Sequence, residues 1–128
     1  MRDKKAILIA DDEPYIRSLL EETLEEIGDK GVSIYIAENG EIGLELALAH
    51  EPNLIFLDVM MPKMNGYEMC AAVRKKHKLE DMHIIMLTAK GQEIDRQRGM
   101  DIGANEYLTK PFDPDEIVAK ANKILGLE

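Results

Sequence analysis

The chain has 128 residues, of which 25 are Asp or Glu and 16 are Lys or Arg, so its formal net charge is −9. This acidic balance argues against direct nucleic-acid binding and against docking on an anionic membrane, because both need a basic surface. A single cysteine, Cys70, excludes an internal disulfide, and no apolar run is long enough for a signal peptide or a transmembrane helix, which predicts a soluble cytoplasmic domain.

Short, continuous apolar runs predict five strands that are buried on both faces, as in a parallel sheet. The predicted strands are 6–10, 32–37, 54–57, 82–88 and 106–109. The third of them runs without a polar break into a single carboxylate, Asp58. Taken alone, this carboxylate is most simply a residue that ends the strand and caps a turn.

Between the strands, apolar residues recur at helical spacing and predict five helices. The predicted helices are 14–27, 40–50, 67–76, 91–102 and 114–125, and the caps of the second and last are Asn39 and Asp113. The apolar residues expected in the second are Ile42, Leu44, Leu46 and Leu48. The fourth has a thin apolar stripe, which suggests a helix that is loosely held or meets a partner. That stripe consists of Ile94, Met100 and Ile102.

Strands that alternate with helices imply right-handed crossovers and a parallel sheet covered by helices on both faces. We therefore expect a single domain over 1–128, with its core from about 5 to 125, built as a three-layer α/β sandwich. In such a sheet the carboxyl ends of the strands open on one edge, where ligands bind. The polar residues at these ends are Asp11, Asp12, Asp58, Thr88 and Lys110.

Charge suggests what this edge of the sheet does. Each polar residue there could be a cap, a sheet hydroxyl or a surface charge, but five of them share one edge. Crowded carboxylates raise one another's pKa unless a cation neutralises them, and oxygen ligands without His or Cys favour Mg²⁺ over zinc. A cation, a lysine and a hydroxyl around a carboxylate suit phosphoryl transfer, in which Asp58 takes up the phosphoryl group as an acyl phosphate.

These motifs resemble the receiver domains of bacterial two-component response regulators, and the resemblance extends from about Lys5 to Leu125. The matching features are the pair Asp11-Asp12, Asp58 with the following Val-Met-Met-Pro, Thr88-Ala89, and Tyr107 followed by Lys110-Pro111-Phe112. The resemblance implies the flavodoxin-like receiver fold, with strand order 2-1-3-4-5.

The resemblance also implies a role for each matching residue. Asp58 would accept a phosphoryl group from a phosphohistidine on a sensor histidine kinase or a histidine phosphotransfer protein. Asp12, Asp58 and the backbone carbonyl of Met60 would bind Mg²⁺ directly, whereas Asp11 would act largely through water. The phosphate would be held by Lys110, by the Thr88 hydroxyl and by the Ala89 N–H.

The output implied by the resemblance is a switch. Thr88 would move toward the phosphate and Tyr107 would turn inward, which changes the face made by the fourth helix, the fifth strand and the fifth helix. That face would then bind a downstream protein or a second copy of the chain. Such a domain has no separate substrate, so it is not an enzyme in the usual sense, although it catalyses its own phosphorylation and dephosphorylation. Met60 and Lys90 are the positions expected to set the dephosphorylation rate, and the Lys110-Pro111 bond is expected to be cis.

Two other functions stay open on the sequence. A small Mg²⁺-dependent phosphohydrolase with an aspartyl intermediate commonly has a second aspartate two residues after the nucleophile, where this chain has Met60. A flavin-binding module would need a phosphate-binding loop after the first strand, where the acid pair would repel a flavin phosphate. We also expect no effector domain within the chain, so it is either a stand-alone receiver or one cut from a longer regulator.

Overall fold

The computed structural model describes residues 5–89 and 96–127. Five parallel strands form one sheet in the order β2-β1-β3-β4-β5, which confirms the predicted sheet and strand order. The strands are β1 Ala6–Ala10, β2 Ser33–Ala37, β3 Leu54–Asp58, β4 His83–Ala89 and β5 Glu106–Lys110. The last three strands each extend one residue beyond their predicted ends, because Asp58, Ala89 and Lys110 still pair in register.

The prediction of five helices was wrong in number, although all predicted helical regions within the described residues contain helix. The helices are α1 Pro14–Thr23, α2 Glu25–Gly28, α3 Gly40–His50, α4 Gly66–Ala71, α5 Arg96–Ile102 and α6 Pro114–Leu125, with a π-helix η1 at Ala72–Lys76. The first predicted helix divides at Leu24, whose backbone leaves the helical region at φ −96° and ψ 7°. Leu24 and Ile27 are both buried in one core, so the apolar pattern continues across the break and does not reveal it.

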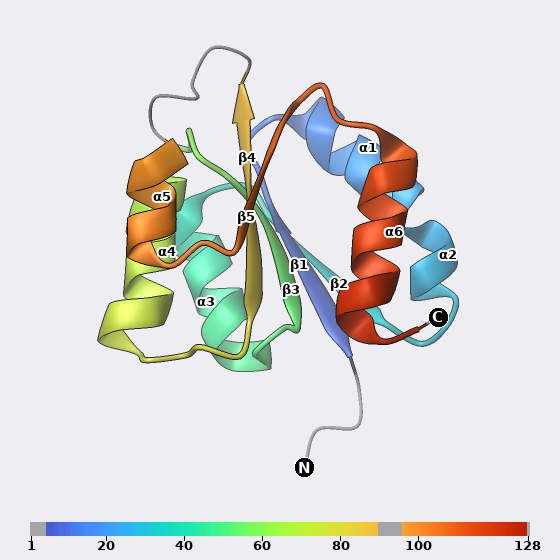
Figure 1. The fold of residues 1–128 in the computed structure, drawn as a ribbon, viewed down its shortest axis with the longest axis horizontal. Coiled ribbons are helices and arrows are strands. Elements are labelled where there is room, and N and C mark those ends of the chain that lie inside the picture. Colours follow the sequence, from blue (N-terminus) through green and yellow to red (C-terminus); the bar gives the residue numbers. More distant parts are fainter. Residues whose placement is uncertain (1–4, 90–95, 128) are drawn as a thin grey trace.

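The helices lie on both faces of the sheet and make the expected three layers. Figure 1 shows α1, α2 and α6 on one side of the strands and α3, α4 and α5 on the other. Successive side chains of a strand point to opposite faces, so Ile7 and Ile9 pack in the core under α1, α2 and α6, whereas Leu8 and Ala10 pack in the other core. Together these two cores hold the sheet rigidly, with the carboxyl ends of its strands at one edge.

Two predicted apolar stripes were partly wrong. Met100 is 43% exposed and Leu48 is 36% exposed, whereas the buried residues of α3 are Gly40, Gly43 and Ala47. The small residues of α3 face inward because the helix packs closely, and a Cβ on Gly43 would lie 2.8 Å from the Met69 sulfur. The start of the predicted helix 91–102, with Ile94, lies outside the described residues, as does Lys90.

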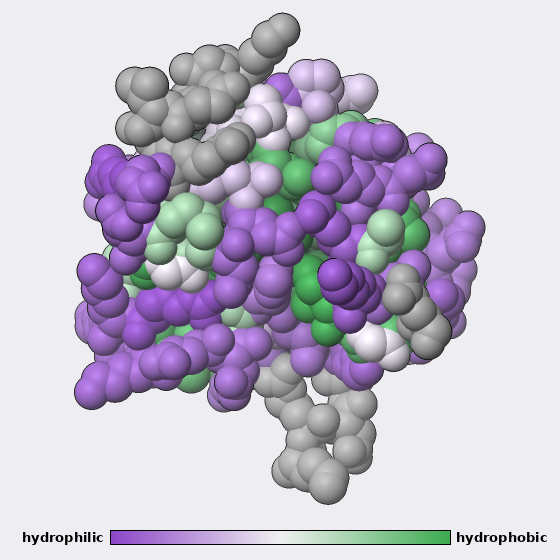
Figure 2. All heavy atoms as spheres, viewed as in Figure 1, coloured by the Kyte–Doolittle hydropathy of each residue, from purple (hydrophilic) through white to green (hydrophobic). Residues whose placement is uncertain are grey.

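The outer surface agrees with the acidic, polar composition. The face seen in Figure 2 is largely hydrophilic, and hydrophobic atoms show only in small patches. Within residues 5–89 and 96–127, no helix is both long enough and apolar enough to cross a membrane.

Candidate functional site

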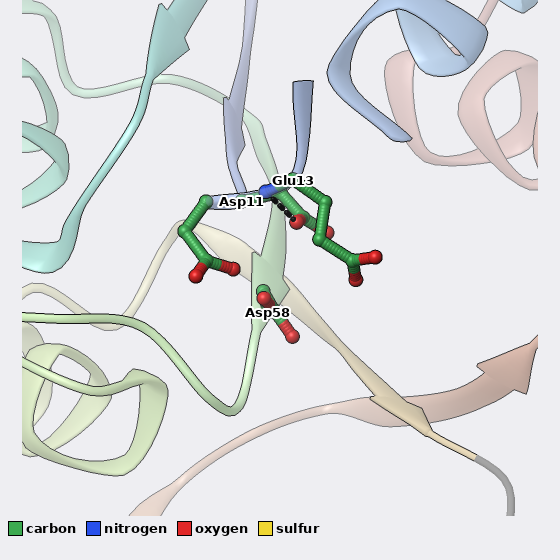
Figure 3. A group of neighbouring side chains, drawn as sticks. Asp11, Glu13 and Asp58 are labelled. Atoms are coloured by element: carbon green, nitrogen blue, oxygen red, sulfur yellow. Dashed lines mark hydrogen bonds between the residues drawn. The ribbon is translucent and has the colours of Figure 1, made fainter. Parts of the chain in front are cut away.

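The site begins where β1 and β3 end side by side. Asp11 follows β1 and its N–H donates to the carbonyl of Ala37 at 3.1 Å, which continues the sheet pairing for one residue. The Glu13 N–H donates to Asp11 Oδ1 at 2.9 Å, so the Asp11 side chain also holds the turn into α1. Asp11 is fully buried and Asp58 is 4% exposed. The sheet therefore fixes both carboxylates at its edge, as Figure 3 shows.

Four carboxylates gather at this edge. One oxygen each from Asp11, Asp12, Glu13 and Asp58 lies within 4.8 Å of the others, and Asp12 and Glu13 are exposed. A cluster of oxygen ligands at this spacing fits a hard divalent cation such as Mg²⁺. Three of these residues were predicted for the site, whereas Glu13 was missed. The signal for Glu13 was the uninterrupted run of three acidic residues after the first strand.

Lys110 reaches into this cluster from the end of β5. Its ammonium Nζ lies 3.0 Å from Asp11 Oδ2, 2.9 Å from Glu13 Oε1 and 3.3 Å from Asp58 Oδ1. Burial by itself lowers the pKa of Lys110, but the hydrogen bond to Glu13 and the charge of Asp58 outweigh burial and raise it. Lys110 is therefore a fixed positive charge beside Asp58. The Lys110-Pro111 bond is cis, as expected.

The surroundings of Asp58 disfavour its charged form. Burial, followed by the charge of Asp11, raises the pKa of Asp58 to about 8, although Lys110 acts in the opposite direction. A carboxylate must be ionised to act as a nucleophile. A divalent cation among these oxygens would lower the pKa of Asp58, because an opposite charge at short range favours the ionised form.

Two buried oxygen atoms beside Asp58 are left without a hydrogen bond among the described residues. They are Asp11 Oδ2, which is ion-paired with Lys110, and the hydroxyl Oγ1 of Thr88. Thr88 follows Leu87, the residue of β4 that pairs with Asp58, so its backbone lies one residue further toward the same edge. Asp11 Oδ2 has the Lys110 ammonium as a partner, whereas the buried Thr88 hydroxyl is unsatisfied, which is costly, and a ligand with polar groups would satisfy it. This observation fits a metal ion and a phosphate at the site.

The loop from β3 to α4 packs directly against Asp58. The Met60 N–H donates to Asp58 Oδ1 at 3.4 Å, and the Met60 side chain is 60% exposed beside the site. The Gly66 N–H donates to the Val59 carbonyl at 2.9 Å. A Cβ on Gly66 would lie 2.4 Å from the Asp58 carbonyl oxygen, so only glycine allows α4 to begin this close to the strand.

The remaining predicted residues lie on β4 and β5. Ala89 pairs with Lys110 at the carboxyl ends of these strands, next to Thr88. Tyr107 is half-buried on β5, and its hydroxyl donates to the Tyr67 hydroxyl at 3.5 Å. The structure thus brings Asp11, Asp12 and Asp58 together, with Lys110 in contact with Asp11 and Asp58. It places Thr88 and Ala89 beside them and Tyr107 against α4 and α5.

Comparison with known proteins agrees with this geometry. A family model described as "Response regulator receiver domain" matches residues 7–122. The chain is 45% identical over 123 residues to "Probable transcriptional regulator ycf27" of Cyanophora paradoxa, covering 96% of this chain and 49% of that protein. It is 42% identical over 121 residues to "Alkaline phosphatase synthesis transcriptional regulatory protein PhoP" of Bacillus subtilis, covering 94% and 48%. The chain thus spans about half the length of the curated relatives it matches.

Solved structures resemble the whole chain. A crystal structure of a putative response regulator from Chloroflexus aurantiacus has a TM-score of 0.83 at 33% identity, covering 97% of this chain and 99% of that one. The chemotaxis protein CheY4 of Vibrio cholerae, crystallised at low pH, has a TM-score of 0.81 at 30% identity, covering 94% and 98%.

Proposed function

The chain belongs to the response regulator receiver domain family of two-component systems, and we propose that Asp58 is its phosphoacceptor. Receiver domains are regulators that interact with histidine kinases and effector domains. The observation that carries the proposal is one nearly buried carboxylate, Asp58, that contacts the ammonium of Lys110 and lies in a cluster with three other carboxylates. The ammonium can bind the incoming phosphate, and the neighbouring carboxylates can hold a metal ion.

The proposed reaction is an in-line transfer from a phosphohistidine on a sensor histidine kinase or a histidine phosphotransfer protein. One Asp58 oxygen forms a bond to phosphorus while the bond from phosphorus to the donor nitrogen breaks, and the electron pair leaves with the imidazole. Lys110 neutralises charge on the phosphoryl oxygens, and the Thr88 hydroxyl and the Ala89 N–H bind them. Positioning and charge neutralisation are the main contributions of a protein to this kind of transfer.

Asp11, Asp12 and Asp58, with the backbone carbonyl of Met60, are the residues proposed to hold Mg²⁺. When bound, Mg²⁺ neutralises charge on the phosphoryl oxygens and keeps Asp58 ionised. Glu13 joins this group as an exposed carboxylate that also pairs with Lys110. Because Lys110 contacts three of the four carboxylates, it would share the neutralisation of the cluster with a bound cation.

Dephosphorylation reverses the modification in the same site. A water molecule attacks phosphorus, the bond to the Asp58 oxygen breaks, and inorganic phosphate leaves as the carboxylate is restored. The domain thus catalyses its own phosphorylation and dephosphorylation in the cytoplasm. Phosphorylation is proposed to change the face around α5, β5 and α6 through Thr88 and Tyr107, and this face then binds a downstream protein or a second copy of the chain. We do not propose direct nucleic-acid binding by this chain, because its net charge is negative.

The alternative of a small phosphohydrolase is not favoured. The matches over nearly the whole chain are to regulators, and position 60, where such an enzyme commonly has a second acid, is an exposed methionine. A hydrolase would turn over small phosphate esters, whereas a receiver domain keeps its phosphoryl group as a signal.

Incubation with acetyl phosphate, with and without Mg²⁺, followed by intact mass measurement, tests the proposal. We expect a single phosphoryl adduct that depends on Mg²⁺ and disappears in Asp58→Asn. The matched control is Asp81→Asn, which changes an exposed aspartate just before β4, at the opposite end of the strand from Thr88. An adduct that persists in Asp58→Asn, or rapid turnover of phosphate esters without an adduct, would overturn it.

A further inference from the structure

The hydroxyl of Tyr107 lies in a close-fitting seat between α4 and α5, which lie side by side in Figure 1. On one side it donates to the hydroxyl of Tyr67, the second residue of α4, at 3.5 Å. On the other side it lies against the backbone of Gly99, which is buried in α5. Two helices therefore meet at the tip of one tyrosine side chain.

Gly99 leaves the space that this tyrosine fills. A Cβ on Gly99 would lie 2.0 Å from the Tyr107 hydroxyl oxygen, 2.8 Å from Cζ and 3.0 Å from Cε2. Non-bonded contacts of a Cβ atom are essentially never shorter than 3.0 Å. Alanine at position 99 is therefore incompatible with the observed position of the Tyr107 side chain. Glycine inside a helix costs about 0.5–1 kcal/mol relative to alanine. Close packing of Tyr107 gives a reason for a glycine in the middle of α5.

Tyr67 links this seat to the phosphoacceptor strand. It is 4% exposed and directly follows Gly66, the residue that packs on the Asp58 carbonyl. The guanidinium carbon of Arg98 lies 4.4 Å from the centre of the Tyr67 ring, in a cation–π contact. Arg98 and Gly99 are neighbours on α5, so this helix contacts Tyr67 and Tyr107 through adjacent residues.

We propose that Gly99 and Tyr67 are positioning residues for Tyr107, and that Tyr67 and Tyr107 change their environments together when Asp58 is phosphorylated. The inference rests on the proposed function, because it uses Tyr107 as the switch residue. It adds that Tyr107 is held in a seat formed by the Tyr67 hydroxyl and the Gly99 backbone. Displacement of Tyr107 breaks its contact with α4 and its packing on α5 at once, so a change at β5 alters how both helices pack. A switch works through an element with two discrete arrangements, and a closely packed seat provides one of them.

Fluorine NMR of the full chain labelled with 3-fluorotyrosine tests this inference. The chain has four tyrosines, so four resonances can be assigned with single Tyr→Phe variants. With acetyl phosphate and Mg²⁺, we expect the Tyr67 and Tyr107 resonances to shift together. The Tyr35 resonance should stay in place, because Tyr35 lies in β2, at the far edge of the sheet, where its ring stacks on His50 of α3. Movement of the Tyr107 resonance alone would overturn the paired change.

The decisive variant is Gly99→Ala. We expect the Tyr107 resonance to be displaced before acetyl phosphate is added, and its response to phosphorylation to fall several-fold, while the Asp58 adduct still forms. The matched control is Gly28→Ala, whose new Cβ would meet only the Ile34 Cδ1 atom at 3.5 Å. A wild-type Tyr107 resonance and response in Gly99→Ala would overturn the inference.

A double variant keeps the inference testable if Gly99→Ala folds poorly. Because the close contacts are to the hydroxyl oxygen, Cζ and Cε2 of Tyr107, adding Tyr107→Leu removes all three atoms, and the double variant should be more stable than Gly99→Ala alone. A double variant that is no more stable would contradict the seat. Failure of the proposed function gives a different result: wild type forms no adduct, while displacement of the Tyr107 resonance by Gly99→Ala still reports on the seat.

Discussion

At the scale of single residues, Asp58 is held in an environment that opposes its charge. Burial and the nearby Asp11 raise its pKa to about 8, and Lys110 offsets only part of this effect. The same environment makes Asp58 responsive to a cation, because an opposite charge at short range favours the ionised carboxylate. Phosphorylation adds negative charge to the cluster, which Lys110 and a cation would neutralise.

Replacement of Asp58 by Asn should stabilise the protein in the absence of Mg²⁺. The pKa of Asp58 in the folded chain, about 8, lies above its ordinary value of 3.8. Folded protein therefore binds a proton that unfolded protein releases, so stability falls as pH rises from 3.8 to about 8. We expect Asp58→Asn to gain at least about 1 kcal/mol near pH 9 and progressively less toward pH 4. Urea denaturation in EDTA from about pH 4 to about pH 9 measures the gain in the free energy of unfolding. A gain that does not change with pH would contradict the raised pKa of Asp58.

Met60 should protect the phosphoryl group from water. Its side chain is 60% exposed next to Asp58, and its bulk can hinder the attacking water molecule. We therefore expect a moderately long-lived phosphoryl group and several-fold faster decay in Met60→Ala. The measurement is the loss of the adduct with Mg²⁺ alone, after acetyl phosphate is removed. Decay of the wild-type adduct within seconds would show that Met60 gives no such protection.

At the scale of secondary-structure elements, the ends of helices and strands are fixed by specific side chains. Asn65 and Glu68 form a complete capping box at the start of α4, which begins one residue before the predicted helix 67–76. Asp113 caps α6 by accepting from the Asp115 N–H at 2.9 Å. The cap of α4 is close to the site, because the next residue, Gly66, packs on Asp58.

Removal of the α4 cap should cost stability. The Asn65 side chain accepts from the Glu68 N–H at 2.9 Å, and Asn65→Ala leaves this donor without its partner. We expect a loss of about 1 kcal/mol in the free energy of unfolding. Asn65→Asp keeps a capping oxygen and is the matched control, with little expected loss. Equal denaturation midpoints for the Ala and Asp variants would argue against the cap.

Glu106 should make the stability of the folded protein depend on pH in the acid range. It starts β5 and lies between His83 of β4, at 2.6 Å, and Lys120 of α6, at 2.5 Å. Burial raises its pKa, but the hydrogen bonds from Lys120 and His83 outweigh burial and lower it below 4.5. The stabilisation is therefore present above this value and is lost as pH falls through the lowered pKa.

We expect Glu106→Gln to lower the melting temperature at neutral pH, with a difference that disappears in acid. Thermal denaturation at several pH values measures this, with Glu45→Gln on the exposed side of α3 as the control. A difference between Glu106→Gln and wild type that stays constant from neutral to acid pH would contradict the role of the ionised group.

At the scale of the whole molecule, the sheet gathers four carboxylates from two distant parts of the chain and a lysine from a third. Asp11, Asp12 and Glu13 are consecutive in the chain, but Asp58 joins them only in the folded protein, so a cation that binds all four carboxylates binds the folded protein preferentially. Binding to the folded state alone stabilises a protein in proportion to the logarithm of ligand concentration.

Mg²⁺ should therefore raise the melting temperature. At ten times its dissociation constant, we expect a gain of about 1.4 kcal/mol, or about 4–7 °C for a domain of this size. KCl at the same ionic strength is the control for general screening, and Asp12→Asn should reduce the gain by removing a ligand. An identical melting temperature in Mg²⁺ and in KCl would contradict cation binding at the cluster.

The amino-acid sequence by itself determined the architecture and most of the site. Buried strands are short apolar runs, and parallel strands end at one edge, so the sequence alone assigns Asp11, Asp12, Asp58, Thr88 and Lys110 to that edge. These are local signals, since each depends on residues close together in the chain. The helix boundaries were less well predicted, because the apolar pattern does not distinguish a continuous helix from one broken at Leu24.

Only the tertiary structure decided which groups touch. Glu13 joins the cluster because Lys110, almost a hundred residues later, reaches it across the sheet edge. The ion pairs of Glu106 join β4, β5 and α6, and Gly99 is explained only by the ring of Tyr107 that rests on it. The physical reason is the same in each case. Contacts between distant segments depend on how helices and strands pack, and the side chains that make them leave no periodic pattern in the sequence.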